Sequence, residues 1–258
     1  MSRVLAVDIG NSNIVVGSFD GNSYRELGRL KSDRKLTEDE IAEGFADLID
    51  KAGLKEISFE GSVLSSVVTE MTDKAAGALK KITGKDALIP TTTMNTEIDV
   101  SRYDTSSLGF DRIADLSGAV SEYGCPVMVC DLGTCTTITV ADEKAKLVGG
   151  MICPGVQLSL DAEAQRTSKL PQLTARGTDK LLGTDTESNM IAGTVAATGI
   201  MLTGLIDRVT REYGFDDLKV VITGGLSEVV AQWIDADVIR DPDLLMKGLF
   251  TIYKKNKC

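Results

Sequence analysis

Two short segments of this 258-residue sequence place an aspartate, one apolar residue and a glycine directly after an apolar stretch. The first reads D-I-G-N-S-N from Asp8, and the second reads D-L-G-T-C-T from Asp131. An aspartate at the end of a strand can hold a cation, and such a turn points backbone N–H groups and hydroxyls at one spot. One copy would fit an ordinary hairpin turn. Two copies in one chain predict phosphate binding.

A third segment has a strand followed by a glycine pair. Residues 220–223 are apolar and end in Thr223, and Gly224 and Gly225 precede a predicted short helix. Missing side chains let a planar group approach the backbone, and a helix N-terminus favours negative charge. This sequence is a common strand-to-helix turn by itself, but beside two phosphate turns it suits adenosine.

The sequence contains no histidine. This excludes a Ser-His-Asp triad, a Cys-His dyad and a histidine-liganded zinc, so acid–base chemistry falls to Asp, Glu, Lys, Tyr or Cys. The five cysteines form no C-x-x-C pair, which disfavours a four-cysteine zinc site. We expect buried thiols in a reducing compartment. They are Cys125, Cys130, Cys135, Cys153 and Cys258.

The composition is that of a soluble globular protein, with 43% hydrophobic and 26% charged residues. The net charge of -10 argues against nucleic acid or an anionic membrane as the main partner, since both reward clustered Lys and Arg. We see no apolar run that approaches the roughly 18–20 residues of a spanning helix. The first residues also lack a signal-peptide pattern, so we expect a cytoplasmic protein.

The elements that must position these turns can be predicted from periodicity. In the first half we expect strands over 4–8, 14–19, 24–30, 62–68 and 87–89, and helices after Thr37, before Gly84 and over 111–123. In the second half we expect strands over 126–131, 136–141, 147–152, 219–223 and 238–240. Helices are expected over 156–165, 186–213, 226–233 and 242–255, with Pro242 at the first helical position of the last.

The pattern of the first half restarts in the second. Each half begins with a strand, the Asp-x-Gly turn and two more strands, and helices follow. A repeat of this length indicates a duplicated domain rather than a solenoid. We therefore predict an α/β protein with domains over 1–124 and 125–258 and a cleft between them.

The three segments together resemble the pattern of the actin, sugar kinase and Hsp70 superfamily. This resemblance implies duplicated actin-like, ribonuclease H-like domains with an interdomain ATP cleft. Within this superfamily, the chain resembles the type III pantothenate kinases nearly end to end. The matching stretches are D-I-G-N-S-N-I-V-V-G-S-F-D from Asp8, L-G-F-D-R from Leu108, D-L-G-T-C-T-T from Asp131, G-G-M-I-C-P-G-V from Gly149, L-P from Leu170, T-E-S-N-M-I-A-G from Thr186, T-G-G-L from Thr223 and D-P-D-L-L-M-K-G-L from Asp241.

The resemblance implies a role for individual residues. The loop around the ATP phosphates would comprise Asp8, Ile9, Gly10, Asn11, Ser12, Asn13, Ile14 and Val15, with Asp8 near Mg²⁺ and Thr134 as a further ATP contact. Asp131 would bind a monovalent cation, K⁺ or NH₄⁺. Asp111 would be the general base. Pantothenate would contact Tyr103, Gly109, Phe110, Asp111 and Arg112, and also Thr186, which would reach into the neighbouring subunit of a homodimer.

Local chemistry gives three of these residues other interpretations. Asp111 would suit any helix start, Tyr103 any amphipathic surface and Thr186 any helix N-cap. The segment after Tyr103 also lacks a proline that many members have and is one residue shorter. Phe110 and Cys135 stand where the family commonly has alanine.

The resemblance implies ATP-dependent phosphorylation of pantothenate to 4'-phosphopantothenate, the first step of coenzyme A biosynthesis. A carboxylate can take the hydroxyl proton without histidine. One alternative is a non-catalytic regulatory or accessory factor on the same scaffold. Such a factor would have no reason to keep Asp8, Asp111 and Asp131, and their presence disfavours this alternative. Another is a phosphatase or a kinase for a different small alcohol.

The predicted long helix 186–213 bears on assembly. Its apolar residues cover more than one stripe, whereas a surface helix of a monomer needs only one. Small residues among them would allow close helix approach. Either the chain's own core or a second subunit must cover the extra apolar surface, and we expect a homodimer.

Overall fold

The chain is described here by a computed structural model that covers residues 3–105 and 108–257. It divides into two compact units. The first comprises the described parts of 1–100, 104–121 and 243–258, and the second comprises 101–103 and 122–242. The unit boundary after residue 121 lies near the predicted one after 124, but the C-terminal helix belongs to the first unit.

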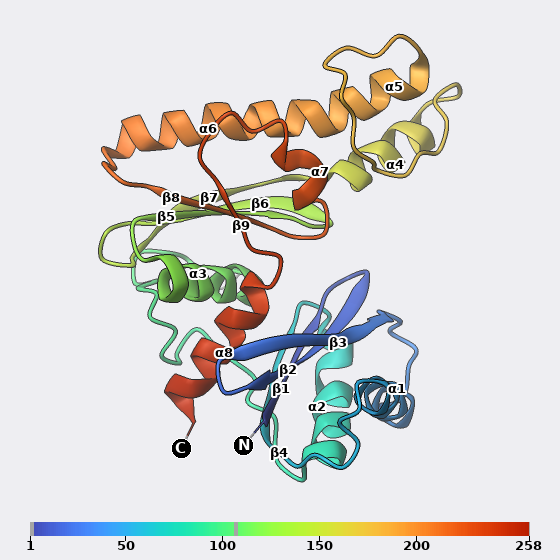
Figure 1. Ribbon diagram of the computed structural model, residues 1–258, viewed down its shortest axis with the longest axis vertical. Helices are drawn as coiled ribbons and strands as arrows, with labels where there is room; N and C mark the ends of the chain where they lie inside the picture. The colour runs from blue at the N-terminus through green and yellow to red at the C-terminus, as the bar shows by residue number, and fades with distance from the viewer. Residues whose placement is uncertain (1–2, 106–107, 258) are drawn as a thin grey trace. The chain divides into compact units, whose positions relative to one another are not determined.

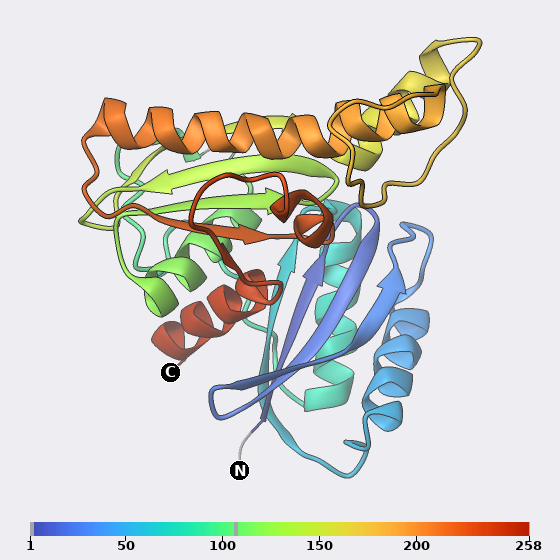
Figure 2. The ribbon, with the colours of Figure 1, turned by 45° about the horizontal axis from the view of Figure 1, so that its top comes forward.

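The first unit is built on a four-stranded sheet in the order β3-β2-β1-β4. Strands β1 (Arg3–Ile9), β2 (Asn13–Asp20) and β3 (Ser23–Lys31) are antiparallel neighbours, and β4 (Phe59–Ser66) runs parallel to β1. Helices α1 (Glu38–Lys51) and α2 (Thr69–Thr83) cover one face, as Figure 2 shows. Helix α8 (Leu244–Asn256) packs on the other face, together with Ala114 of α3 (Phe110–Tyr123).

Alternation along β1 explains this three-layer arrangement. Leu5, Val7 and Ile9 are buried in the cluster with α1 and α2, whereas Val4 and Ala6 are buried in the cluster with α8. A strand with both faces covered reads as a continuous apolar run, as this one does. The predicted helix signals are also confirmed, since Thr37 and Glu40 form a capping box and Gly84 ends α2 at φ 71°.

The second unit repeats the order of the first and adds one strand at the end, giving β7-β6-β5-β8-β9. Its strands are β5 (Val127–Leu132), β6 (Cys135–Ala141), β7 (Leu147–Pro154), β8 (Lys219–Thr223) and β9 (Ile239–Arg240). Here too the first three are antiparallel, and the fourth, β8, is parallel to the first. The shared order confirms the predicted duplication.

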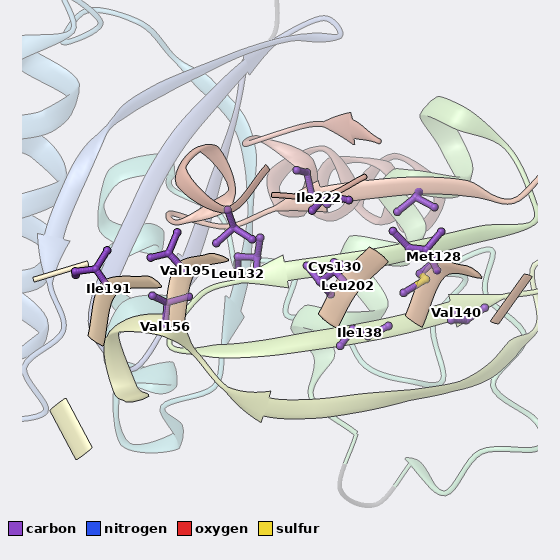
Figure 3. Packing of buried hydrophobic residues seen from close by; sticks show 14 of the residues in the cluster. Met128, Cys130, Leu132, Ile138, Val140, Val156, Ile191, Val195, Leu202 and Ile222 are labelled. Atoms are coloured by element: carbon purple, nitrogen blue, oxygen red, sulfur yellow. The ribbon is translucent and has the colours of Figure 1, made fainter. Parts of the chain in front are cut away.

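A long helical run lies along one face of this second sheet (Figure 1). It consists of α5 (Thr186–Ile191), a π-helical turn (Ala192–Ala196) and α6 (Ala197–Tyr213). Figure 3 shows Ile191, Val195 and Leu202 of this run with Met128 and Ile138 of the sheet. Helices α4 (Val156–Arg166) and α7 (Ser227–Ala231) add Val156 and Val230 to the same core.

Three local predictions need correction. The last helix begins at Leu244, so Pro242 precedes it and is not its first residue. Residues 87–89 form only a single bridge between Leu88 and Val63, because this segment touches the edge of β4 at one point. The residue that caps α5 is Asp185, which accepts from the Ser188 N–H, and Thr186 is the first helical residue.

The expectation about apolar runs is also wrong for one segment. The helical run Thr186–Tyr213 is long and apolar enough to cross a membrane by length and composition. The reason is that alanines, glycines and threonines interrupt the large apolar residues without making the segment charged. Half of its most apolar window is buried inside the fold, where it forms the core shown in Figure 3.

Candidate functional site

The first Asp-x-Gly turn connects β1 to β2 and is held by hydrogen bonds from three sides. The Gly10 N–H donates to the Asn13 carbonyl at 2.9 Å, which closes the turn. The Ser32 Oγ donates to the Gly10 carbonyl at 2.6 Å, and the Val67 N–H donates to the Ile9 carbonyl at 3.0 Å. The turn therefore has a fixed backbone while its tip, residues 11–13, is exposed.

Asp8 lies one residue before this turn and is half-buried. It is in register with Val15 on β2 and with Ser65 on β4. Because alternate residues of a strand share a face, Asp8 lies on the α8 side of the sheet with Val4 and Ala6. Ile9 and Ile14 point the other way and are fully buried in the core with α1 and α2.

A tyrosine on the same sheet lies in a buried, negatively charged environment. Burial raises the pKa of Tyr24, with further contributions from the charges of Glu26, Asp243 and Asp8. The phenol is therefore protonated at neutral pH. Its ring fills the space beside Gly17, where a Cβ would collide with it.

The second Asp-x-Gly turn connects β5 to β6 and is held mainly by close packing of glycines. The Gly133 N–H donates to the Cys135 carbonyl at 3.1 Å, and Thr134 is exposed at the tip. The Gly155 N–H donates to the Thr134 carbonyl at 3.2 Å. A Cβ on Gly155 would collide with the carbonyl oxygens of Gly133 and Thr134, so the Pro-Gly segment from β7 must lie directly against the turn.

The glycine pair after β8 adjoins the same turn within the second unit. Asp131 is in register with Thr223, and the Leu226 N–H donates to the Leu132 carbonyl at 3.1 Å. Gly224 has φ +87°, and a Cβ there would collide with the Asp131 carboxylate and the Leu132 backbone. Glycine is therefore required at this position on two grounds. The structure thus brings two predicted segments together around Asp131.

Asp111 lies in the first turn of α3 and is half-buried. Its Oδ1 accepts from the Arg112 N–H at 2.9 Å. The carboxylate folds back over Gly109, where a Cβ would meet it. Helix α3 is fixed against α8 because Gly118 and Gly248 let the two backbones touch. Arg112 itself is buried, whereas Gly109 and Phe110 are half-buried.

The remaining predicted residues lie in the second unit. Tyr103 is half-buried in a bend, and Thr186 is exposed at the start of α5. The predicted site residues are thus divided between the units, with Asp8–Val15 and Gly109–Arg112 in the first and Tyr103, Asp131, Thr134 and Thr186 in the second. Of the cysteines, Cys130 is buried, whereas Cys125, Cys135 and Cys153 are half-buried and Cys258 lies outside the described residues. Burial raises the pKa of the Cys130 thiol to about 12, with Asp131 as a second cause.

The donor set decides which ions the turns can accept. Within residues 3–105 and 108–257, no three Cys, Asp or Glu side chains gather into a chelating cluster. Mg²⁺ is commonly bound by one or two carboxylates together with substrate phosphates and water. Asp8 beside a phosphate-type turn fits that ion. Asp131 likewise supplies one carboxylate, which lies close to Gly133 and Gly224.

Some contributors were not identified by sequence reasoning. Ser32, which directly follows β3, donates a hydrogen bond to the first turn, and the Gly155 N–H donates one to the second. Gly155 carried a signal, because it belongs to a matched stretch of the family pattern. Ser32 carried none, since an isolated serine after a strand does not indicate which carbonyl it will reach.

Comparison with known proteins gives one consistent family. The family model described as type III pantothenate kinase matches residues 4–208. A protein named type III pantothenate kinase from Agathobacter rectalis is 32% identical over 252 residues, covering 98% of this chain and 97% of the relative. Relatives of the same name from Halalkalibacterium halodurans and Brevibacillus brevis are 32% and 33% identical, and each match covers 98% of this chain and 99% of the relative.

Solved structures share the fold at lower sequence identity. A Campylobacter jejuni protein named for the Baf family of transcriptional activators superposes with TM-score 0.61 at 20% identity, covering 98% of both chains. A ROK family glucokinase from Streptomyces griseus, solved with glucose and AMPPNP, gives TM-score 0.53 at 14% identity, again over 98% of both chains. These likenesses confirm the predicted actin-like, sugar-kinase fold.

Proposed function

This chain belongs to the type III pantothenate kinase family, and we propose that it transfers the terminal phosphoryl group of ATP to the primary hydroxyl of pantothenate. Family membership makes it a kinase of coenzyme A biosynthesis, an enzyme rather than an accessory factor on the same scaffold. The observation that carries the proposal for this chain is the pair of braced Asp-x-Gly turns, each at the end of the first strand of a duplicated sheet.

We assign the phosphates of ATP to the two turns. Asp8 to Val15 would surround the phosphates, because the exposed tip at 11–13 offers backbone N–H groups, amides and a hydroxyl on a fixed backbone. Thr134 would add a contact from the second turn, where it is exposed. Mg²⁺, when bound beside Asp8, would neutralise negative charge on the phosphates.

Asp111 is proposed as the general base. The pantothenate hydroxyl oxygen would form a bond to the terminal phosphorus while the bond from that phosphorus to the bridging oxygen of ADP breaks. The hydroxyl proton would go to the Asp111 carboxylate. The half-buried position of Asp111 at a helix start, with Gly109 leaving space for it, supports this role. Tyr103, Gly109, Phe110, Arg112 and Thr186 are proposed as pantothenate contacts.

Replacing Asp111 by Asn tests this assignment. We expect kcat to fall by at least about 10²-fold, the range for loss of a general base, while AMPPNP binds as to the wild type. The exposed helical Asp73→Asn in the same unit is the matched control and should leave kcat unchanged. Near wild-type turnover of Asp111→Asn in an ADP-release assay would show that another group takes the proton.

Asp131 is proposed to hold K⁺ or NH₄⁺. Its carboxylate lies against Gly133 and Gly224 beside the second turn, so a cation there would offset repulsion between this carboxylate and the phosphates of ATP. We further propose a cytoplasmic enzyme without nucleic acid or membrane partners, supported by the net charge of -10.

A homodimer is proposed on the outer side of the helical run. Its inner side is in the core, but Gly193, Ala197, Ile200 and Gly204 are exposed at helical spacing. Ile200 is 48% exposed, and the space beside both glycines is open. A partner covering this stripe could bring Thr186 of one chain to the pantothenate site of the other.

Light scattering should then give twice the mass of one chain. Ile200→Asp should lower both this mass and kcat/KM for pantothenate, because a charge would be buried in the interface. Glu143→Lys, an exposed charge change in the β6–β7 turn of the same unit, is the control. A monomeric variant with full activity would show that one chain forms the whole pantothenate pocket.

A further inference from the structure

Strand β4 contains a buried hydroxyl that the fold does not use. Ser65 is 3% exposed, and its Oγ has no hydrogen-bond partner among the residues that the structure describes. Burying a hydroxyl without a partner is unfavourable, and each such group in a native fold calls for an explanation. The next residue, Ser66, shows the ordinary alternative, since its Oγ donates to the Val68 carbonyl at 3.0 Å.

The position of Ser65 gives that explanation. Ser65 is the parallel-strand neighbour of Asp8 in the β1–β4 register. Directly paired residues of neighbouring strands are about 4.8 Å apart and share a face of the sheet. Ser65 and Asp8 therefore lie on the α8 face, the face that also carries Val63 and Ala6. A water or ion between them would satisfy the hydroxyl.

The second unit has a hydroxyl residue at the equivalent sheet position. Asp131 is the parallel-strand neighbour of Thr223, which is 4% exposed, in the β5–β8 register. Each half of the molecule thus places a buried hydroxyl residue beside the aspartate that precedes its turn.

We propose that Ser65 is a positioning residue for the metal bound at Asp8, holding through its Oγ a water of the Mg²⁺ that accompanies ATP. The inference rests on the proposed function, which assigns Mg²⁺ to Asp8. Ser65 acts through that water and through Asp8, and it takes no proton in the reaction. Groups that hold such outer-shell positions commonly change metal affinity by tenfold or more.

Strand β4 also supplies the matched control. Ser62 is 1% exposed, and its Oγ likewise has no hydrogen-bond partner within residues 3–105 and 108–257. It pairs with Leu5, whose side chain lies in the core on the α1 and α2 face. Ser62 and Ser65 are thus equally buried serines on one strand that lie on opposite faces, and only one is beside Asp8.

The test measures AMPPNP binding to the full chain by isothermal titration calorimetry, once with Mg²⁺ and once with EDTA. The Kd in EDTA divided by the Kd in Mg²⁺ gives the factor by which metal strengthens binding. Ser65→Ala should reduce this ratio by about tenfold and leave the Kd in EDTA unchanged. Ser62→Ala should keep the wild-type ratio, and Ser65→Thr, which retains a hydroxyl, should restore most of it.

Thermal unfolding distinguishes this role from a structural one. Removing an unsatisfied buried hydroxyl should leave Tm unchanged or raise it in both alanine variants, because no protein hydrogen bond is lost. A Ser65→Ala protein with the wild-type ratio of Kd values would overturn the proposal. If Asp8→Asn also kept the wild-type ratio, the assignment of Mg²⁺ to Asp8 in the proposed function would be wrong. If only Ser65→Ala kept it, the role of Ser65 alone would be wrong.

Discussion

The two Asp-x-Gly turns have the same place in the two sheets, and both accept backbone hydrogen bonds from neighbouring segments, but they differ in how closely other residues pack on them. In the first, the Ser32 hydroxyl and the Val67 N–H bind carbonyls of the turn, and the nearest atom to a Cβ on Gly10 would be 3.4 Å away. In the second, Gly155 and Gly224 pack directly on the turn, and neither position has space for a Cβ.

This difference shows what a duplicated unit can change without changing its fold. Hydrogen bonds from outside the turn fix its backbone and leave a polar tip of three exposed residues, 11–13. In the second turn, Gly155 lies against the carbonyls of Gly133 and Thr134, Gly224 lies against the Asp131 carboxylate, and Thr134 is exposed. The duplicated position can therefore differ in its packing while the strand order stays the same.

The largest expected effect on stability comes from adding a methyl group at Gly155, which packs on the second turn, compared with adding one at Gly10 in the first turn. Gly155→Ala should destabilise the fold by about 1–3 kcal/mol, because its Cβ would meet backbone oxygens that cannot rotate away. Its activity should fall with the displaced second turn. Gly10→Ala, which has space for a Cβ, should change stability by less than about 1 kcal/mol. Chemical denaturation with a coupled kinase assay measures both, and equal losses would show that the turns are held alike.

An intermediate effect is expected from replacing the aspartate of each turn, because Asp131 is proposed to bind K⁺ or NH₄⁺ and Asp8 to bind Mg²⁺. Asp131→Asn should abolish the difference between rates in K⁺ and in Na⁺ and lower the K⁺ rate by at least about tenfold. Asp8→Asn should keep the K⁺ dependence and raise the Mg²⁺ concentration needed for half-maximal rate. Rates are measured in K⁺, NH₄⁺, Na⁺ and Tris buffers across a Mg²⁺ series. A wild-type enzyme with equal rates in all four buffers would contradict the cation assignment.

The smallest effect is expected from the brace of the first turn. Ser32→Ala removes the 2.6 Å hydrogen bond to the Gly10 carbonyl. One such bond is worth about 1 kcal/mol, so KM for ATP should rise about threefold to fivefold with little change in kcat. Ser23→Ala, exposed at the other end of the β2–β3 hairpin, is the control. An unchanged KM would mean that the Val67 and Asn13 hydrogen bonds suffice to hold the turn.

Most of the fold could be predicted because its signals are local. The capping box at Thr37, the glycine that ends α2 and the alternation along β1 each depend on residues a few positions apart. The last helix starts later than Pro242 indicates, because proline at a first helical position is only a tendency and a turn at 242–243 precedes the helix. The C-terminal helix joined the first unit because Gly248 meets Ala114 and Gly118 of α3, a contact between segments over a hundred residues apart.

The sequence by itself determined the two turns, their repeat, the exclusion of histidine chemistry and the family. These follow from residue type and spacing along the chain. Only the tertiary structure decided that Ser32 binds the first turn, that Gly155 and Gly224 pack on the second, and that Ser65 lies beside Asp8. The physical reason is that strand register and backbone contact join residues distant in sequence. A serine or a glycine has the same local propensity whether or not such a neighbour exists.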